Sequence, residues 1–131
     1  MIYSNPLVYF MNHFKIATSQ KSLYFDVSLT PRSLELLHLF HKLNLVRTYR
    51  RKSSKSIYRV YPTYNLYRNK PRVLKTYLRS SHELHVPLKL LRIINIHRPF
   101  SFIVLETNKG ILTHKEAIKF NISGRVIMHI I

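Results

Sequence analysis

The residues F-I-V-L-E-T-N-K-G-I-L-T-H-K-E-A-I-K-F-N-I-S-G-R-V-I-M-H-I-I, from Phe102 to Ile131, carry the clearest structural pattern in this 131-residue chain. They predict a strand, a tight turn, a short helix and a final strand. The chain has two glycines: Gly110 lies in the turn, and Gly124 lies before the last strand. Because glycine lacks a Cβ, it tolerates left-handed backbone angles and close approach of other atoms. Polar and basic side chains surround both glycines, so this end is the first candidate for a binding site.

The sequence before this stretch predicts an α+β protein of two small domains. We expect the N-terminal domain to span residues 1–66, with the element order α-β-α-β-β. Asn5-Pro6 and Thr30-Pro31 each pair a capping residue with proline at the first helical position, which is typical of a helix start. Asn44 can end the second helix in a left-handed conformation. The expected strands cover residues 23–27, 45–51 and 56–61, the last two forming a hairpin.

The C-terminal domain, residues 67–131, is expected to be mainly β with a short helix. Its predicted strands cover residues 73–78, 102–105 and 125–131, and a short helical segment is expected near 88–94. Thr113 and Glu116 have the spacing of a capping box, in which the two residues satisfy backbone groups at a helix start. The short helix should therefore begin after Thr113 and run to about Asn121.

Charge is the dominant bulk property. The chain has 22 Lys and Arg against 5 Asp and Glu, a formal net charge of +17. Self-repulsion at this charge disfavours a lone compact protein, and nucleic acid is the commonest polyanionic partner. Basic residues alternate with tyrosines over residues 47–59 and 64–79, a mixture that suits phosphates and unpaired bases. No lysine-rich amphipathic helix or long apolar run favours a membrane partner.

The residues give little support to enzyme chemistry. The five carboxylates are scattered, whereas metal-dependent nucleases need clustered acids. His82-Glu83-Leu84-His85 is one residue short of the H-E-x-x-H zinc motif. His38 and His41 could share one helix face but lack an obvious third ligand. The chain has no cysteine, which excludes disulfides, zinc ribbons and thiol catalysis. We expect no catalytic residue, metal or cofactor, and a metal-dependent nuclease is the alternative function.

The turn from Glu106 to Gly110 combines a hydroxyl, an amide, a cation and backbone N–H groups. Structured RNA with splayed bases or exposed 2′-hydroxyls is recognised by such mixtures of donors and acceptors. An ordinary hairpin turn explains the same residues equally well. Spacing alone leaves both interpretations open.

The stretch Glu106–Ala117, followed by Ser123-Gly124-Arg125, resembles the family of the eighth protein of the small ribosomal subunit. That family carries S-T-S-K-G-[VI]-[ML]-T-[DH]-[RK]-x-A and then a G-G-E turn. Asn5-Pro6 stands where the family opens its first helix with Asp-Pro. Thr30-Pro31-Arg32 falls at a polar, basic helix start, and Arg79-Ser80-Ser81 falls near the family's R-P-G turn.

The resemblance implies two α+β domains and a non-enzymatic structural constituent of the small subunit. Such a protein binds the central domain of small-subunit rRNA directly and supports subunit assembly and translation. Its implied partners are this rRNA and neighbouring small-subunit proteins, and we expect neither a membrane partner nor a homo-oligomer. The expected rRNA-binding residues are Asn5, Lys15, Thr30, Arg32, Arg79, Ser80, Ser81, Glu106, Thr107, Asn108, Lys109, Gly110, Gly124 and Arg125.

Within the C-terminal stretch, two departures from the family pattern change a charge. Glu106 replaces a serine, and Arg125 replaces the glutamate of G-G-E. Either a charge has been exchanged across the site or the RNA that it contacts differs.

Composition bears on the compartment. The chain is rich in Tyr, Phe, Ile, Asn and Lys and poor in Gly, which suits an AT-rich coding genome. We infer a protein of the mitochondrial ribosome, encoded in the organelle, with a plastid or an AT-rich bacterium as the alternative. Because Asn5-Pro6 stands at the family's own start, we expect no cleaved targeting segment.

Overall fold

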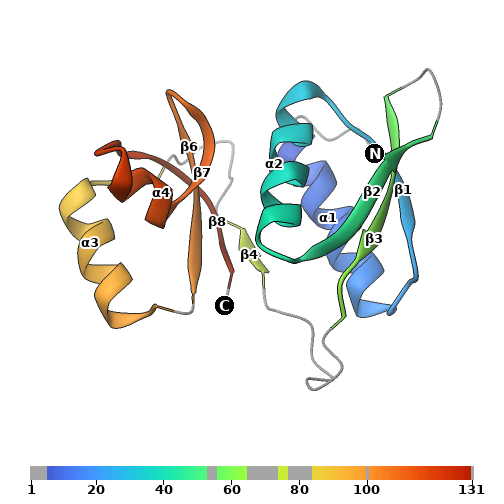
Figure 1. Ribbon diagram of the computed structural model, residues 1–131, viewed down its shortest axis with the longest axis horizontal. Coiled ribbons are helices and arrows are strands. Elements are labelled where there is room, and N and C mark those ends of the chain that lie inside the picture. The colour runs from blue at the N-terminus through green and yellow to red at the C-terminus, as the bar shows by residue number, and fades with distance from the viewer. Residues whose placement is uncertain (1–5, 53–55, 65–73, 77–83, 100, 131) are drawn as a thin grey trace. The chain divides into compact units, whose positions relative to one another are not determined.

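The computed structural model describes residues 6–52, 56–64, 74–76, 84–99 and 101–130, with only the backbone described for 74–76. The contacts within the chain group it into two compact units, Met1–Pro71 and Arg72–Ile131. Both units combine helices with antiparallel strands (Figure 1), so the α+β prediction is confirmed. The sequence placed the division after residue 66, and residues 65–73 lie outside the described part.

The N-terminal unit has the predicted order α-β-α-β-β. Its three strands form an antiparallel sheet in the order β1-β3-β2. Figure 1 shows both helices on the same side of this sheet. The elements are α1 (Pro6–Ser19), β1 (Phe25–Ser28), α2 (Pro31–Lys42), β2 (Val46–Arg51) and β3 (Ile57–Pro62).

An apolar stripe on each helix forms the core of this unit. Leu7, Phe10, Met11 and Phe14 recur at helical spacing on α1 and are all buried. Phe40 of α2 packs between two of them, with ring centroids 5.5 Å from Phe10 and 5.0 Å from Phe14. Burying an apolar side chain of this size contributes about 2 kcal/mol. The stripe therefore fixes which face of each helix meets the sheet.

Local signals set the ends of α2 as the sequence predicts. The Thr30 hydroxyl oxygen accepts a hydrogen bond from the Ser33 N–H at 3.3 Å, so Thr30 is the N-cap. Asn44 has φ 62, the left-handed conformation expected just beyond the last turn. Thr30 supplies a partner for a backbone N–H at the start of the helix, and Asn44 turns the chain away at its end.

The C-terminal unit is built around β8. Strands β4, β5 and β6 all pair with it in antiparallel fashion, and β7 pairs with β6. Helices α3 and α4 contact each other, and α4 contacts β6. The elements are β4 (Leu74–Thr76), β5 (His85–Val86), α3 (Leu88–His97), β6 (Phe102–Thr107), β7 (Gly110–Thr113), α4 (His114–Lys119) and β8 (Gly124–Ile130).

The structure differs from the expected strand-turn-helix-strand pattern in one respect: strand β7 lies between the turn and the helix. Its four residues are too few to show an alternating pattern, and its last residue, Thr113, also caps α4. The Thr113 hydroxyl accepts from the Glu116 N–H at 3.4 Å, as the capping box predicts. The sheet therefore continues directly into the helix, without an intervening loop.

His114 joins three elements of this unit. Its side chain is fully buried, and its Nδ1 accepts a hydrogen bond from the Ile103 N–H of β6 at 3.1 Å. Since Nδ1 accepts, the neutral ring carries its proton on Nε2, which lies 3.2 Å from Asn95 Oδ1 of α3. Burial lowers the pKa of His114, and the nearby positive charges of Lys115 and His129 lower it further.

The stability of the C-terminal unit should consequently fall in acid. Because the folded pKa lies below the unfolded value of about 6.5, the unfolded chain takes up the proton first. The stabilisation is complete above pH 6.5 and is lost as the pH falls from there through the lowered folded pKa. Urea unfolding at pH 7.5 and 5.5 should show this loss. His114→Leu should be less stable at pH 7.5 and show a smaller pH dependence than the wild type.

His97→Ala, which removes an exposed histidine from α3, is the control and should keep the wild-type pH dependence. An unchanged pH dependence in His114→Leu would contradict this role.

Candidate nucleic-acid interface

The β6–β7 hairpin brings together the polar residues that the sequence singles out. Thr107 pairs with Gly110 across the ladder, which leaves Asn108 and Lys109 as the turn. Gly110 has φ 101, an angle that side-chain-bearing residues rarely adopt. The expectation that this glycine serves a left-handed conformation is therefore confirmed.

The Thr107 hydroxyl holds the turn together. It donates a hydrogen bond to the Gly110 carbonyl oxygen at 2.9 Å and accepts one from the Lys109 N–H at 3.2 Å. A hydroxyl has one hydrogen and two lone pairs. The turn uses the hydrogen and one lone pair, so a ligand would find a single acceptor position on this residue.

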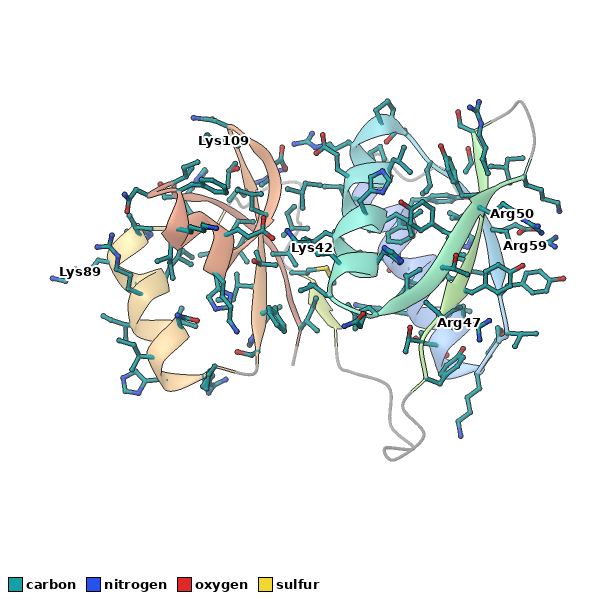
Figure 2. The ribbon with its side chains drawn as sticks, viewed as in Figure 1. Lys42, Arg47, Arg50, Arg59, Lys89 and Lys109 are labelled. Atoms are coloured by element: carbon teal, nitrogen blue, oxygen red, sulfur yellow. The ribbon has the colours of Figure 1, made fainter. Side chains whose placement is uncertain are left out.

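The tip of the hairpin presents the other two side chains to solvent. Asn108 and Lys109 are exposed, and Figure 2 shows Lys109 extending from the end of the hairpin. The Lys109 ammonium lies 4.7 Å from the centroid of the Phe120 ring, a cation–π contact that still leaves its N–H groups able to donate. The tip therefore combines an amide, a cation and an aromatic ring that is 45% exposed.

Sequence reasoning missed Phe120. It caps the C-terminal end of α4, eleven positions after Lys109, and no short motif connects the two. A signal was present, because a large apolar residue stands at a helix end beside Lys119 and Asn121. That signal points to an exposed ring, whereas the partner of the ring becomes visible only in the folded chain.

Glu106 and Arg125, the two departures from the C-terminal family pattern that change a charge, contact each other. They are register partners on β6 and β8, and Arg125 Nη2 donates to Glu106 Oε2 at 2.6 Å. Only 23% of the Arg125 side chain and 21% of the Glu106 side chain are exposed. A charge-assisted hydrogen bond of this length is strong, and it cancels the negative charge of Glu106. The carboxylate therefore does not leave an unbalanced negative charge at the base of the hairpin.

Gly124 serves close approach between two strands. A Cβ built there would lie 2.4 Å from the Glu106 carbonyl oxygen and 2.9 Å from Thr107 Cγ2. Real Cβ atoms do not approach so closely, so any side chain would push β8 away from β6. The sequence placed Gly124 among the expected rRNA-binding residues, and its neighbour within the chain is the backbone of the adjacent strand.

The remaining expected site residues lie elsewhere. Thr30 caps α2, and Arg32 is exposed on the first turn of the same helix. Lys15 is partly buried on α1. The expected residues outside the described part of the chain are Asn5, Arg79, Ser80 and Ser81.

The histidine pair on α2 has an aromatic neighbour. The Tyr49 ring lies edge-on to His38 and His41, with centroids 5.3 and 5.6 Å away, and its hydroxyl is hydrogen-bonded to His38 Nδ1. Within the described residues, no group of three or more His, Cys, Asp and Glu side chains could hold a metal ion. The other histidine motif begins at His82 and Glu83, outside the described part. No helix among the described segments is long and apolar enough to cross a membrane.

Comparison with known proteins gives one family. The family model described as ribosomal protein S8 matches residues 5–131, nearly the whole chain. No curated protein matches.

A charge swap tests the pairing at the base of the hairpin. Arg125→Glu places two carboxylates opposite each other and should lower the free energy of unfolding by about 1–2 kcal/mol, between the values for exposed and buried pairs. Adding Glu106→Arg restores opposite charges and should recover most of this loss. Unfolding midpoints in urea measure both effects.

Lys119→Glu changes the net charge by the same amount at an exposed position and controls for relief of overall repulsion. The pairing would be refuted if the double variant were as unstable as Arg125→Glu.

Proposed function

The chain belongs to the ribosomal protein S8 family and is therefore a small-subunit ribosomal protein; we propose that it binds a helix of the central domain of small-subunit rRNA directly. In this proposal the bound chain stabilises the RNA fold during subunit assembly and remains as a structural constituent during translation. The main support for this proposal is the geometry of the β6–β7 hairpin, which exposes Asn108 and Lys109 at its tip.

Within the hairpin, some residues support the turn and others contact the RNA. The internal bonds of Thr107 restrain the turn before RNA arrives, and Gly110 adopts the positive φ that this turn requires. Asn108 and Lys109 can then donate to phosphate, ribose or base oxygens without an entropic cost for ordering the turn. Arg125 keeps Glu106 from repelling the phosphates. The five expected contacts at 106–110 thus separate into three supporting residues and two that face the RNA. Glu106, Thr107 and Gly110 are the supporting residues, and Asn108 and Lys109 face the RNA.

The bulk charge supports the same partner. At +17 the chain repels itself, and binding a polyanion relieves that repulsion while releasing the counterions of the RNA. Phosphate contacts give affinity, whereas the polar hairpin tip gives selectivity for an irregular RNA surface. The two contributions respond differently to salt, so experiment can separate them.

Structural roles for three of the five acids support a function without catalysis. Asp26 is paired with Lys52 and Arg59, and Glu106 is paired with Arg125. Glu116 occupies the first turn of α4, at the position of the capping box. A nuclease would need such carboxylates to hold divalent cations.

We further propose that neighbouring small-subunit proteins are the other partners and that the chain does not form a homo-oligomer. The composition supports a mitochondrial ribosome as the site of action. Co-sedimentation of the tagged chain with small subunits from the isolated organelle tests this placement, and recovery with ribosomes of another compartment would refute it.

Removing the hairpin cation should weaken rRNA binding. Lys109→Ala deletes a charge-assisted donor and should cost about 1–2 kcal/mol, roughly a 5- to 30-fold rise in Kd for a central-domain rRNA fragment. The slope of log K against log salt should also become shallower by about one. Filter binding at several salt concentrations measures both quantities.

Lys89→Ala is the matched control, since it removes the same charge from α3 in the same unit (Figure 2). It should leave the affinity for the fragment almost unchanged. Equal losses for the two variants would mean that the hairpin contributes only bulk charge.

A further inference from the structure

The N-terminal sheet has a second face that its own helices do not cover. Buried Val27 and Val60 point toward α1 and α2. Side chains alternate along a strand and register partners share a face, so Asp26, Arg59 and Arg50 point the other way together. Figure 2 shows Arg50 and Arg59 on the side of the sheet turned away from the helices.

Ion pairs order the centre of this outer face. Asp26 on β1 accepts two hydrogen bonds from Arg59 on β3. Arg59 Nε lies 3.0 Å from Asp26 Oδ1, and Arg59 Nη2 lies 3.4 Å from Asp26 Oδ2. Lys52 Nζ lies 3.0 Å from the same Oδ2. The two-point contact fixes the plane of the Arg59 guanidinium, whereas a single contact would leave it free to rotate.

Two tyrosine rings extend this ordered centre. The Arg59 guanidinium carbon lies 4.3 Å from the centroid of the Tyr24 ring, and the Tyr24 and Tyr61 centroids are 6.0 Å apart. The guanidinium carbon of Arg47 lies 6.0 Å from the Tyr61 centroid. The four side chains therefore form one continuous row, in the order Arg59, Tyr24, Tyr61 and Arg47. Within this row, Tyr24 is 44% exposed.

The charge and the rings together indicate the occupant. Arg47, Arg50, Lys52 and Arg59 carry four positive charges against the one negative charge of Asp26, a net charge of +3 on this face. Cations alone would suit the phosphates of any duplex. Exposed aromatic faces and guanidinium planes add a surface on which unpaired bases stack, and a base-paired helix does not offer its base faces.

We propose that the outer face of the N-terminal sheet binds a short single-stranded RNA segment, with bases stacked on Tyr24 and Tyr61 and phosphates held by Arg47 and Arg50. Asp26 holds Arg59 over the Tyr24 ring, so the row exists before the RNA binds. This site lies in the other unit of the chain from the β6–β7 hairpin and uses different chemistry. An acidic protein segment would use the cations of this face but gain little from the aromatic faces.

Ring-dependent binding of single-stranded RNA tests the proposal. The probe is a fluorescent oligouridylate of about ten nucleotides, within the usual site size for single strands. Fluorescence anisotropy with the full chain compares the double variant Tyr24→Leu/Tyr61→Leu with Tyr24→Phe/Tyr61→Phe. The phenylalanine pair keeps both rings and should bind like the wild type. The leucine pair should lose about 5- to 150-fold for each ring that stacks on a base.

Salt and a matched control separate stacking from charge. A chain of +17 binds any polyanion, but the ratio between the leucine and phenylalanine variants should persist as salt is raised, because stacking releases no counterions. Lys89→Ala removes an exposed cation from the other unit and should leave oligouridylate binding almost unchanged.

Equal affinity of the leucine and phenylalanine variants would overturn the proposal and favour an acidic protein partner. A second measurement does not depend on any variant: photo-crosslinking of 4-thiouridine oligonucleotides to the wild-type chain. Crosslinks at Tyr24 or Tyr61 support the site. Crosslinks confined to the C-terminal unit would exclude it.

Discussion

The pairing of β6 with β8 is the contact on which the C-terminal unit depends. Strand β8 also holds β4 and β5, so the sheet has no alternative centre. The close approach of the two strands requires Gly124, where a Cβ would collide with the backbone of Glu106. The same register places Arg125 beside Glu106 and extends β6 into the hairpin. Because Gly124 has no Cβ, β8 can pair with β6, and this pairing positions both the sheet and the candidate binding turn.

Two of the five acidic residues of this basic chain organise the cations around them. Asp26 orders Lys52 and Arg59 on the N-terminal sheet, and Glu106 orders Arg125 beneath the hairpin. Each carboxylate lowers the local repulsion and fixes the direction of an arginine. The chain has 5 acidic and 22 basic residues, so an acidic residue relieves the most repulsion where it lies next to cations. The remaining positive charge is then available to a polyanion, and its position is defined where selectivity is needed.

Features that depend on neighbours in the sequence could be predicted from the sequence. Thr30 and Thr113 cap helices through atoms three residues away, and Asn44 and Gly110 take up left-handed angles within single turns. Features that depend on strand register could not. The Glu106–Arg125 contact spans 19 positions, and the collision at Gly124 appears only once β8 lies against β6. Strand β7 was missed because four residues that end in a helix cap carry too little pattern.

The basic and aromatic residues of the N-terminal unit illustrate the same limit. Their interleaving along residues 47–59 indicated nucleic acid, but the strand register decides which of them share the outer face of the N-terminal sheet. Tyr24 and Asp26 come from a distant part of the sequence and complete that face. The candidate site likewise changed in detail, since the Thr107 hydroxyl serves the turn, and Asn108 and Lys109 remain to meet a ligand.

Crosslinking of the wild-type chain to a central-domain rRNA fragment is the most direct test of the central claim, that the hairpin tip contacts this RNA. Ultraviolet crosslinking followed by mass spectrometry locates the modified peptide and nucleotide. We expect a crosslinked peptide that contains Asn108 and Lys109, joined to a single helical region of the fragment. A bound complex whose crosslinks all lie outside residues 106–110 would contradict it.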